Sequence, residues 1–314
     1  MTRTIEPASA TFTGAAGNRL VADVFGRGGQ PVLLLHGGGQ TRHAWRKTAE
    51  VIAQTGRTAY ALDQRGHGDS EWSAEGAYSF SDFAADAKTV AIEIEKRSGM
   101  KPVAIGASLG GIASLLAEGE SVHAHGGSLF SALVLVDITP RVDPEGVSRI
   151  HGFMRAHASE GFASVAEAAQ AVADYLPHRP RPKSNECLKK NLRLSPDGRW
   201  RWHWDPRFMD GPRRVGADRE KAEAMLVEAA RRIGIPALLV RGASSELVQE
   251  AHVREFLQLV PHADYVDVGG ARHMVAGDRN DHFAAALLDF LQKLGGAPDS
   301  VRSRNIEVSA NSGE

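Results

Sequence analysis

The chain has 314 residues, of which 42% are hydrophobic and 24% charged, so it has enough apolar material for one large or two small globular domains. Lys and Arg number 37 against 38 Asp and Glu, and this near-neutral balance argues against nucleic acid as the main partner, because phosphate binding requires a basic surface. The single cysteine, Cys187, excludes an internal disulfide and a cysteine-based metal site.

The first residues of the chain lack the apolar core of a signal peptide, and no stretch approaches the length needed to span a bilayer. We therefore expect a cytoplasmic protein with no membrane partner. At the other end, residues 295–314 are polar and aperiodic, and we predict that this tail is disordered.

The first part of the chain predicts strands and helices in alternation. Residues 8–13 and 20–25 alternate apolar and polar side chains, which indicates a hairpin-like pair of strands. Continuous apolar runs at 31–36 and 58–63 are typical of central strands covered on both faces, and a helix pattern at 44–54 separates them. The elements expected next are a helix at 80–97, a strand at 102–106, a helix at 109–118 and a strand at 132–137.

The pattern changes after Pro140. Residues 141–230 predict helices broken by Pro-rich and Arg-rich loops, without strand–helix alternation. The alternation then resumes with a strand at 235–241, a helix at 249–259, a strand at 264–268 and a helix at 281–294. We therefore predict a core of residues 1–140 and 231–294 built on a doubly wound, mostly parallel sheet. Residues 141–230 would form a lid over the carboxyl ends of the strands, where such sheets bind ligands.

One turn in this pattern carries a catalytic signature. Residues 106–110 read Gly-Ala-Ser-Leu-Gly, with a predicted strand before them and a predicted helix after them. A serine at the tip of so tight a turn has strained backbone geometry, and the glycines allow the chain to pack closely around it. The Ser108 hydroxyl would stand at the edge of the sheet, facing the free N–H groups and positive dipole end of the helix. That environment suits a developing oxyanion.

Four motifs together give the chain a resemblance to a known family. They are His36-Gly-Gly-Gly39, the run from Asp63 to Ser70, the serine turn at 106–110, and Gly269-Gly-Ala-Arg-His-Met274. In this order they resemble the α/β-hydrolase fold, over about residues 8–294. The resemblance implies an eight-stranded, mostly parallel sheet with a helical lid, and a nucleophile–acid–histidine triad in that chain order.

The resemblance assigns three catalytic roles. Ser108 matches the nucleophile, and His273, on the loop after the last strand, matches the base that takes its proton. The family usually places the acid in the loop that is here residues 242–248, where Glu246 is available. Asp137, at the end of the strand after the nucleophile helix, is the alternative that some relatives use. We favour Glu246, because a longer carboxylate can still hold the imidazole tautomer.

The resemblance also implies an oxyanion hole made by the backbone N–H groups of Gly38 and Leu109. His36 and His67 are expected to shape the rim of the site without titrating. Since the serine turn lacks a dinucleotide fingerprint and the chain has no Gly-Lys-Ser/Thr phosphate loop, we expect no cofactor and no metal.

The sequence offers a few candidates for binding a substrate. Trp200, Trp202 and Trp204 alternate, so on a strand they would share one face beside a pocket for an apolar acyl or ring group. A lid core packed on itself explains the same pattern equally well. Met274, next to the predicted base, is a further candidate.

The leading hypothesis is a cofactor-independent serine hydrolase of a small ester, lactone or related acyl compound. Capped relatives with the same triad also cleave carbon–carbon bonds or act as cofactor-free haloperoxidases or oxygenases, and others are ligand receptors with little turnover. Dehalogenases and epoxide hydrolases need an aspartate nucleophile, which position 108 lacks. The partner is therefore a small-molecule substrate. The sequence leaves its identity and the choice between monomer and homodimer open.

Overall fold

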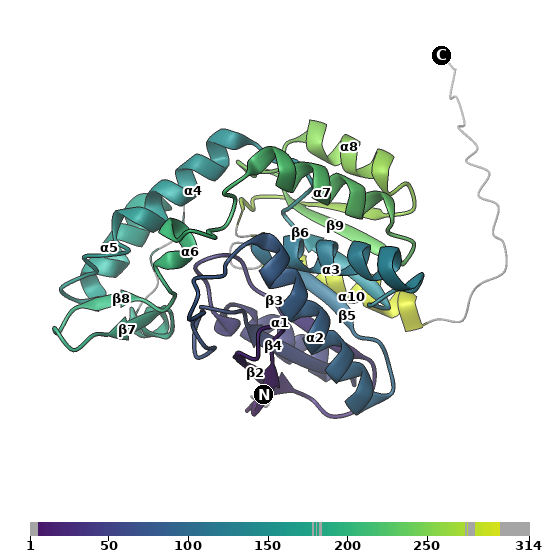
Figure 1. Ribbon diagram of the computed structural model, residues 1–314, viewed down its shortest axis with the longest axis horizontal. Helices are drawn as coiled ribbons and strands as arrows, with labels where there is room; N and C mark the ends of the chain where they lie inside the picture. The colour runs from purple at the N-terminus through teal and green to yellow at the C-terminus, as the bar shows by residue number, and fades with distance from the viewer. Residues whose placement is uncertain are drawn as a thin grey trace, which may run out of the picture.

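A β-sheet runs through the centre of the protein, and its strands follow the order β1-β2-β4-β3-β5-β6-β9-β10 (Figure 1). The computed structural model describes residues 6–177, 179, 181, 184–273, 275 and 280–295. The strands of the sheet are β1 (Ala8–Thr13), β2 (Arg19–Phe25), β3 (Pro31–Leu35), β4 (Thr58–Asp63), β5 (Val103–Ala107), β6 (Ala132–Val136), β9 (Ala237–Gly242) and β10 (Asp264–Val268).

Most strands of the sheet run in the same direction, so the loops that follow them lie along one edge of the sheet. β1 and β2 pair antiparallel, β2 joins β4 antiparallel, and every pairing from β4 to β10 is parallel. The predicted eight-stranded, mostly parallel sheet is therefore confirmed. Parallel strands end at the same edge, so the residues that follow β3, β4, β5, β6, β9 and β10 all meet at the carboxyl edge.

Helices cover both faces of the sheet, as expected for strands that are apolar throughout. One buried apolar cluster joins the sheet to α2 (Phe80–Ser98), α3 (Leu109–His125), α7 (Arg219–Arg231) and α8 (Glu250–Leu259). A second cluster on the opposite face joins it to α1 (Arg46–Gln54) and α10 (Asn280–Gly295). The result is a three-layer α/β/α core.

The α2 helix shows how local sequence signals produce these layers. Ser79 and Asp82 form a capping box at its start, and Gly99 ends it in the left-handed conformation with φ 75°. In between, the apolar stripe predicted from the spacing, Phe83, Ala87, Val90 and Ile94, is buried against the sheet.

Residues 141–218, between β6 and α7, are called the cap segment below. Figure 1 shows its helices and its small hairpin lying to the left of the core. Its elements are α4 (Pro144–Ala156), α5 (Val165–Tyr175), a 3-10 helix (Glu186–Asn191), β7 (Leu192–Leu194), β8 (Trp200–Trp202) and α6 (Arg207–Asp210). It has an apolar cluster of its own, in which Phe162, Ala168 and Leu192 are buried.

The α7 helix was included in the predicted lid of residues 141–230, but it packs on the core. A Cβ atom at Gly119 in α3 would lie 2.6 Å from the Cα and Cβ of Ala229 in α7. The two helices therefore touch backbone to backbone, which glycine makes possible. Within the predicted lid, residues 219–230 therefore pack as part of the core.

Two sequence predictions fall on residues that the structure does not describe. These are the disordered tail, apart from Gly295, and the substrate contact of Met274. Of the helices in the described ranges, none is both long and apolar enough to cross a bilayer.

Candidate active site

The turn between β5 and α3 has the strained geometry that the sequence predicts. Ser108 has φ 48° and ψ −114°, a conformation that L-residues rarely adopt. Its backbone N–H donates to the Val136 carbonyl at 3.1 Å, which ties the turn to the end of β6. Neighbouring structure thus holds the serine at the carboxyl edge, half-buried and at the start of α3.

The glycines of this turn are required by close packing. A Cβ on Gly106 would lie 2.3 Å from the Gly110 carbonyl oxygen, and a Cβ on Gly110 would lie 2.2 Å from the Leu35 carbonyl oxygen. Both contacts are with backbone atoms, which cannot rotate away. Any larger residue at either position would push α3 away from the sheet.

His273 forms a hydrogen-bonded pair with Asp137. Its Nδ1 atom lies 2.8 Å from the Oδ2 atom of Asp137, whose side chain is fully buried. An ionised carboxylate can only accept, so a hydrogen bond to ionised Asp137 requires the proton on Nδ1 and leaves the lone pair on Nε2. Asp137 directly follows β6 and Ser108 directly follows β5, and the parallel register pairs Ala107 with Val136. The acid and the serine therefore leave adjacent strand ends.

The acid in this pair is Asp137, the alternative candidate, so the preference for Glu246 is not supported by the geometry. Glu246 instead lies near Tyr175 of α5, where burial and the Glu246 charge raise the pKa of the tyrosine to about 12. Its Oε2 atom is buried with no hydrogen-bond partner among the described residues. The loop position pointed to Glu246, but the distance along the chain does not reveal which carboxylate faces the histidine.

The glycine loop after β3 presents one free N–H group beside the serine. Gly37 donates its N–H to the Gln40 side chain at 3.2 Å, and Gly39 donates to Nε2 of His67 at 3.1 Å. Within the described part of the chain, the N–H of Gly38 has no acceptor, and neither has that of Leu109, the first residue of α3.

The loop and the serine turn lie against each other. A Cβ at Gly37 would lie 3.5 Å from the Cβ of Ser108, and one at Gly38 would lie 3.9 Å from Cδ2 of Leu109. The two predicted oxyanion donors, Gly38 and Leu109, are thus neighbours, both with unpaired N–H groups. Such a pair of donors is what an oxyanion hole requires.

His36 and His67 are fully buried and hold the loops in place. Burial, above all, lowers the pKa of His36 to about 4 and that of His67 to about 3. Both rings are therefore neutral at ordinary pH. Nε2 of His36 accepts the Gln64 N–H at 3.1 Å, and His67 accepts that of Gly39. The two histidines connect the loops that follow β3 and β4.

The cap segment supplies an apolar wall next to the glycine loop. The Cζ of Phe208 would lie 3.2 Å from a Cβ on Gly38, and the Cε of Met154 would lie 2.9 Å from one on Gly39. Sequence reasoning missed both residues, because nothing local distinguishes a phenylalanine or methionine that packs on a loop more than 100 residues earlier in the chain.

The three alternating tryptophans divide between two sites. Trp200 and Trp202 pack on the apolar cluster of the cap segment, where Trp202 meets the ring of Phe162 edge-on at 5.1 Å. Trp204 is buried, forms a β-bridge with His67, and has its Nε1 atom 3.8 Å from a Cβ position on Gly39. Trp204 therefore lies against the loop of the candidate site.

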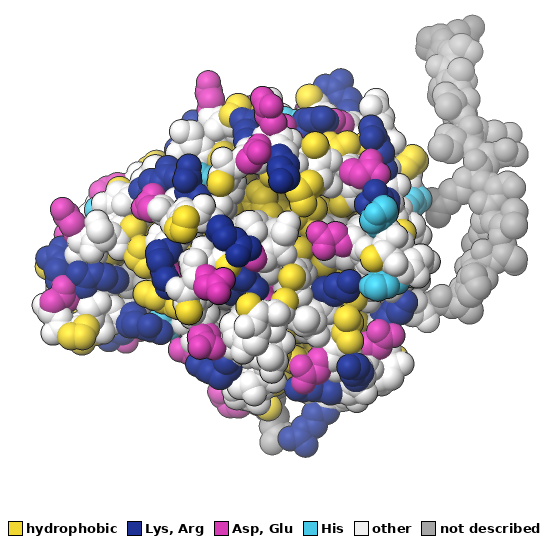
Figure 2. Space-filling model, in the orientation of Figure 1, with side chains coloured by type: hydrophobic (Ala, Val, Ile, Leu, Met, Phe, Trp, Pro, Cys, Tyr) yellow, Lys and Arg dark blue, Asp and Glu magenta, His cyan; other side chains and the backbone are white. Residues whose placement is uncertain are grey.

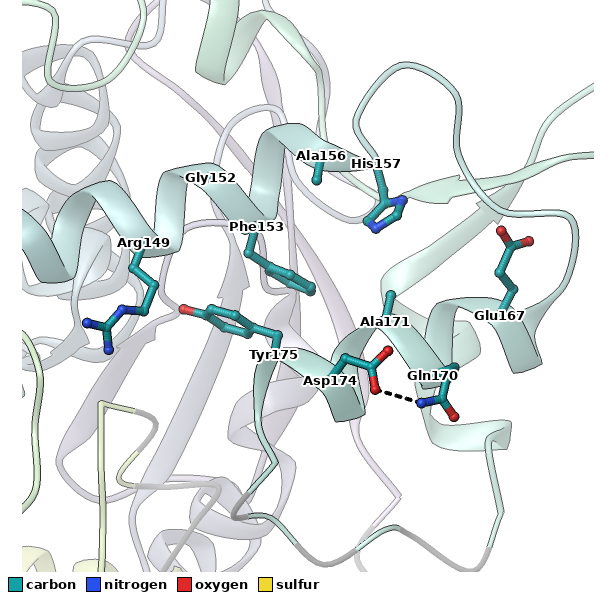
Figure 3. A pocket seen from close by; sticks show the side chains of 10 residues that line it. All are labelled: Arg149, Gly152, Phe153, Ala156, His157, Glu167, Gln170, Ala171, Asp174 and Tyr175. Carbon is teal, nitrogen blue, oxygen red and sulfur yellow. Dashed lines mark hydrogen bonds between the residues drawn. The ribbon is translucent and has the colours of Figure 1, made fainter.

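A groove also lies between α4 and α5, away from the serine turn. Figure 3 shows its lining side chains, with Phe153 and Tyr175 stacked at a centroid distance of 4.1 Å. All ten lining residues come from residues 149–175, so the groove contains no residue of the candidate site.

Throughout the described ranges, the groove included, no cluster of three His, Cys, Asp or Glu side chains is arranged to hold a metal ion.

The fold and the site together define a class of protein: α/β enzymes with a serine on a strained strand–helix turn and a histidine–carboxylate pair beside it. Comparison with known families agrees. The model of the alpha/beta hydrolase fold family matches residues 30–279, and the chain belongs to this family.

Two individual relatives are named as an esterase and a hydrolase. The chain is 28% identical to the esterase Rv0045c of Mycobacterium tuberculosis over 235 residues, 74% of this chain and 72% of the esterase. It is 26% identical to the 2-(acetamidomethylene)succinate hydrolase of Mesorhizobium japonicum over 257 residues, 82% and 86% of the two chains.

Solved structures show the same fold. A crystal structure of an E-2-(acetamidomethylene)succinate hydrolase matches with a TM-score of 0.77 at 23% identity, covering 91% of this chain and 99% of that one. The structure of the esterase Rv0045c matches with a TM-score of 0.69 at 25% identity, covering 91% and 92%. The protein is therefore a hydrolytic enzyme of the alpha/beta hydrolase fold.

Proposed function

We propose that the protein is a cofactor-independent serine hydrolase that acts on a small ester, lactone or related acyl compound. Ser108 is the nucleophile, His273 the general base and Asp137 the acid that orients it. The observation that carries the proposal is the 2.8 Å hydrogen bond between His273 and Asp137, beside the strained turn that holds Ser108.

The first half of the reaction acylates the serine. Nε2 of His273 takes the Ser108 proton while Oγ bonds to the substrate carbonyl carbon. The carbonyl oxygen becomes an oxyanion that accepts hydrogen bonds from the Gly38 and Leu109 N–H groups. The tetrahedral adduct then collapses, the bond to the leaving oxygen breaks, and that oxygen takes the proton from His273.

The second half releases the acyl group. Water attacks the acyl carbon and gives one proton to Nε2 of His273, and the same two N–H groups bind the new oxyanion. When the bond to Oγ breaks, Ser108 recovers its proton from His273. The products are a carboxylic acid and an alcohol, joined in one molecule if the substrate is a lactone.

The surroundings of the donors favour an apolar acyl group. Phe208, Met154 and Trp204 are all buried and lie against the glycine loop, and none of them carries a charge. Small apolar chains would lose water on entering such a site, which stabilises the complex. The esterase and hydrolase relatives are consistent with a small-molecule acyl substrate.

Labelling and turnover test the proposal together. Wild type should react with a fluorophosphonate probe and hydrolyse p-nitrophenyl acetate and butyrate over many turnovers. Ser108→Ala should lose both properties, whereas Ser244→Ala, which alters an exposed serine, should retain both. Labelling that persists in Ser108→Ala, or its absence in wild type, would contradict the assignment. Labelling with about one turnover would instead indicate a ligand receptor, and labelling without ester hydrolysis would direct attention to carbon–carbon cleavage or oxygenase chemistry.

A further inference from the structure

We propose that Ser245 is a positioning residue that holds the catalytic carboxylate of Asp137, an inference that rests on the proposed function. Ser245 follows β9, in the loop from which related enzymes usually supply the acid itself. In this chain the carboxylate comes from the end of β6. The loop after β9 still contacts the catalytic carboxylate, through the hydroxyl group of Ser245.

The geometry around Asp137 places Ser245 in contact with the acid. Oγ of Ser245 lies 2.6 Å from Oδ2 of Asp137, the same oxygen that accepts from His273 at 2.8 Å. The other oxygen, Oδ1, accepts the Gly242 N–H at 2.9 Å. Among the described residues, two of the three donors on this buried carboxylate therefore come from the end of β9 and the loop that follows it, residues 242–245.

The direction of the Ser245 hydroxyl follows from its other contacts. Oγ accepts the N–H groups of Leu247 at 3.1 Å and Val248 at 3.0 Å. Those groups can only donate, so the hydroxyl proton of Ser245 is left for Asp137. Leu247 and Val248 are buried, and their packing fixes the position of the serine. A hydroxyl fixed in this way restrains the rotation of the Asp137 carboxylate.

Orientation of this carboxylate matters because it sets which nitrogen of His273 carries the proton. With Oδ2 held by Ser245 and Oδ1 held by Gly242, the plane of the carboxylate is fixed relative to the imidazole ring. Removing one donor would allow the carboxylate to turn. Nε2 of His273 would then point at the Ser108 hydroxyl less often, which slows turnover more than it weakens substrate binding.

The first test removes the hydroxyl. Ser245→Ala should lower kcat roughly 10- to 100-fold, the range expected when a hydrogen bond to a charged group is lost, with little change in KM. Ser245→Thr keeps a hydroxyl and should recover most of the rate. Ser244→Ala, at the exposed neighbouring serine, is the matched control and should behave as wild type. A kcat in Ser245→Ala within about threefold of wild type would overturn the proposal.

Ser245→Ala could also lower activity by loosening the loop, because two N–H groups lose their acceptor. An exchange variant separates the two effects. Asp137→Ser alone should be nearly inactive, whereas Asp137→Ser combined with Ser245→Asp places a carboxylate in the loop next to His273. We expect at least a tenfold recovery over the single variant. No recovery, with a melting temperature equal to that of the single variant, would show that position 245 does not act on His273.

A spectroscopic measurement keeps this test independent of turnover. The proton that His273 Nδ1 shares with Asp137 should give a low-field proton NMR signal, assigned by its loss in His273→Ala. Ser245→Ala should shift or broaden this signal, and Ser244→Ala should not. An unshifted signal would overturn the proposal even if the enzyme is active. A Ser245-dependent signal in a protein that fluorophosphonate does not label would support the positioning role and reject the proposed hydrolase.

Discussion

At the carboxyl edge of the sheet, Ser108 and Asp137 have positive φ angles and are held by residues distant in the sequence. The cap segment instead has a small apolar cluster of its own and exposed ion pairs on its surface, while its inner residues join the apolar cluster of the core. Ser108 and Asp137 are the two non-glycine residues with positive φ in the described part of the chain. Strained positions persist only where the surrounding structure enforces them. We therefore expect the geometry to be restrained more tightly at the edge than on the exposed face of the cap segment.

The surface of the cap segment shows the same contrast. Two of its ion pairs are exposed, Arg201 with Asp197 at 2.7 Å and Arg155 with Asp210 at 3.1 Å. Figure 2 shows many Lys and Arg side chains on the left-hand part of the molecule, over the cap segment. Exposed pairs of this kind contribute little to stability because water and salt screen them. By contrast, the ion pair between Arg65 and Asp86 at the core edge is buried, so water and salt screen it much less.

The largest expected effect comes from a change at Asp137, the proposed acid. Asp137→Asn keeps the shape of the side chain but presents an amide to His273 and should reduce kcat about 10⁴-fold, as when the triad carboxylate of a serine protease becomes an amide. Glu246→Gln, which changes the carboxylate near the cap segment, should reduce it by less than about threefold. Steady-state hydrolysis of p-nitrophenyl butyrate measures both. Equal losses in the two variants would mean that Glu246 shares the role of the acid.

A second prediction concerns pH and the two buried histidines of the edge. The unfolded chain binds protons on histidine near the ordinary pKa of 6.5, whereas folded His67 stays neutral down to about pH 3 and folded His36 down to about pH 4. Acid therefore favours the unfolded chain between those values. Between pH 7 and pH 4, His67 alone should remove roughly 3 kcal/mol from the free energy of unfolding.

Urea titrations at several pH values measure this loss. His67→Gln removes the titrating group but leaves an amide oxygen that can accept from Gly39, so the fall in stability with decreasing pH should become shallower. His123→Gln, on the exposed end of α3, serves as the control. If wild type and His67→Gln lose stability in parallel, burial of the His67 ring is not the source of acid sensitivity.

The next largest effect is expected from a substitution that disturbs the packing of the serine turn. Gly110→Ala would place a Cβ 2.2 Å from the Leu35 carbonyl oxygen, so α3 or β3 must shift. Overpacking of this kind should cost about 2–3 kcal/mol in the free energy of unfolding and reduce fluorophosphonate labelling by moving Ser108. Chemical denaturation and labelling rates measure the two effects. A variant as stable and reactive as wild type would show that the turn tolerates a side chain there.

Sequence was sufficient for most of the core because its signals are local. The apolar run at 58–63 predicts β4 with the same bounds, and the spacing at 80–97 predicts α2 to within one residue of its end. The Gly-x-Ser-x-Gly turn was identified because the strand before it and the helix after it give the pattern its meaning. Each of these signals lies within one element or within two consecutive elements.

The features that the sequence did not predict depend on contacts between segments that are distant along the chain. The choice between Asp137 and Glu246 depends on which carboxylate faces His273. Asp137 follows the end of β6 and Glu246 lies in the loop after β9, and either carboxylate could in principle accept a hydrogen bond from the histidine. Likewise α7, an ordinary amphipathic helix by its sequence, was assigned to the lid because its packing partner, α3, lies about 100 residues earlier. Spacing along the chain contains no information about such pairings.

The smallest expected effect concerns the packing density around α4 of the cap segment. Gly152 lies in α4, with an ordinary helical φ and nothing within 4 Å of the Cβ that alanine would add. Gly152→Ala should therefore stabilise the protein by about 0.5–1 kcal/mol, because alanine loses less backbone entropy in a helix and meets no neighbour. The same substitution thus has opposite signs at position 152 and at position 110. Denaturation of both variants under one set of conditions measures the contrast. If Gly152→Ala were destabilising as well, the exposed face of α4 would have to pack as tightly as the serine turn, and the distinction between the two regions would not hold.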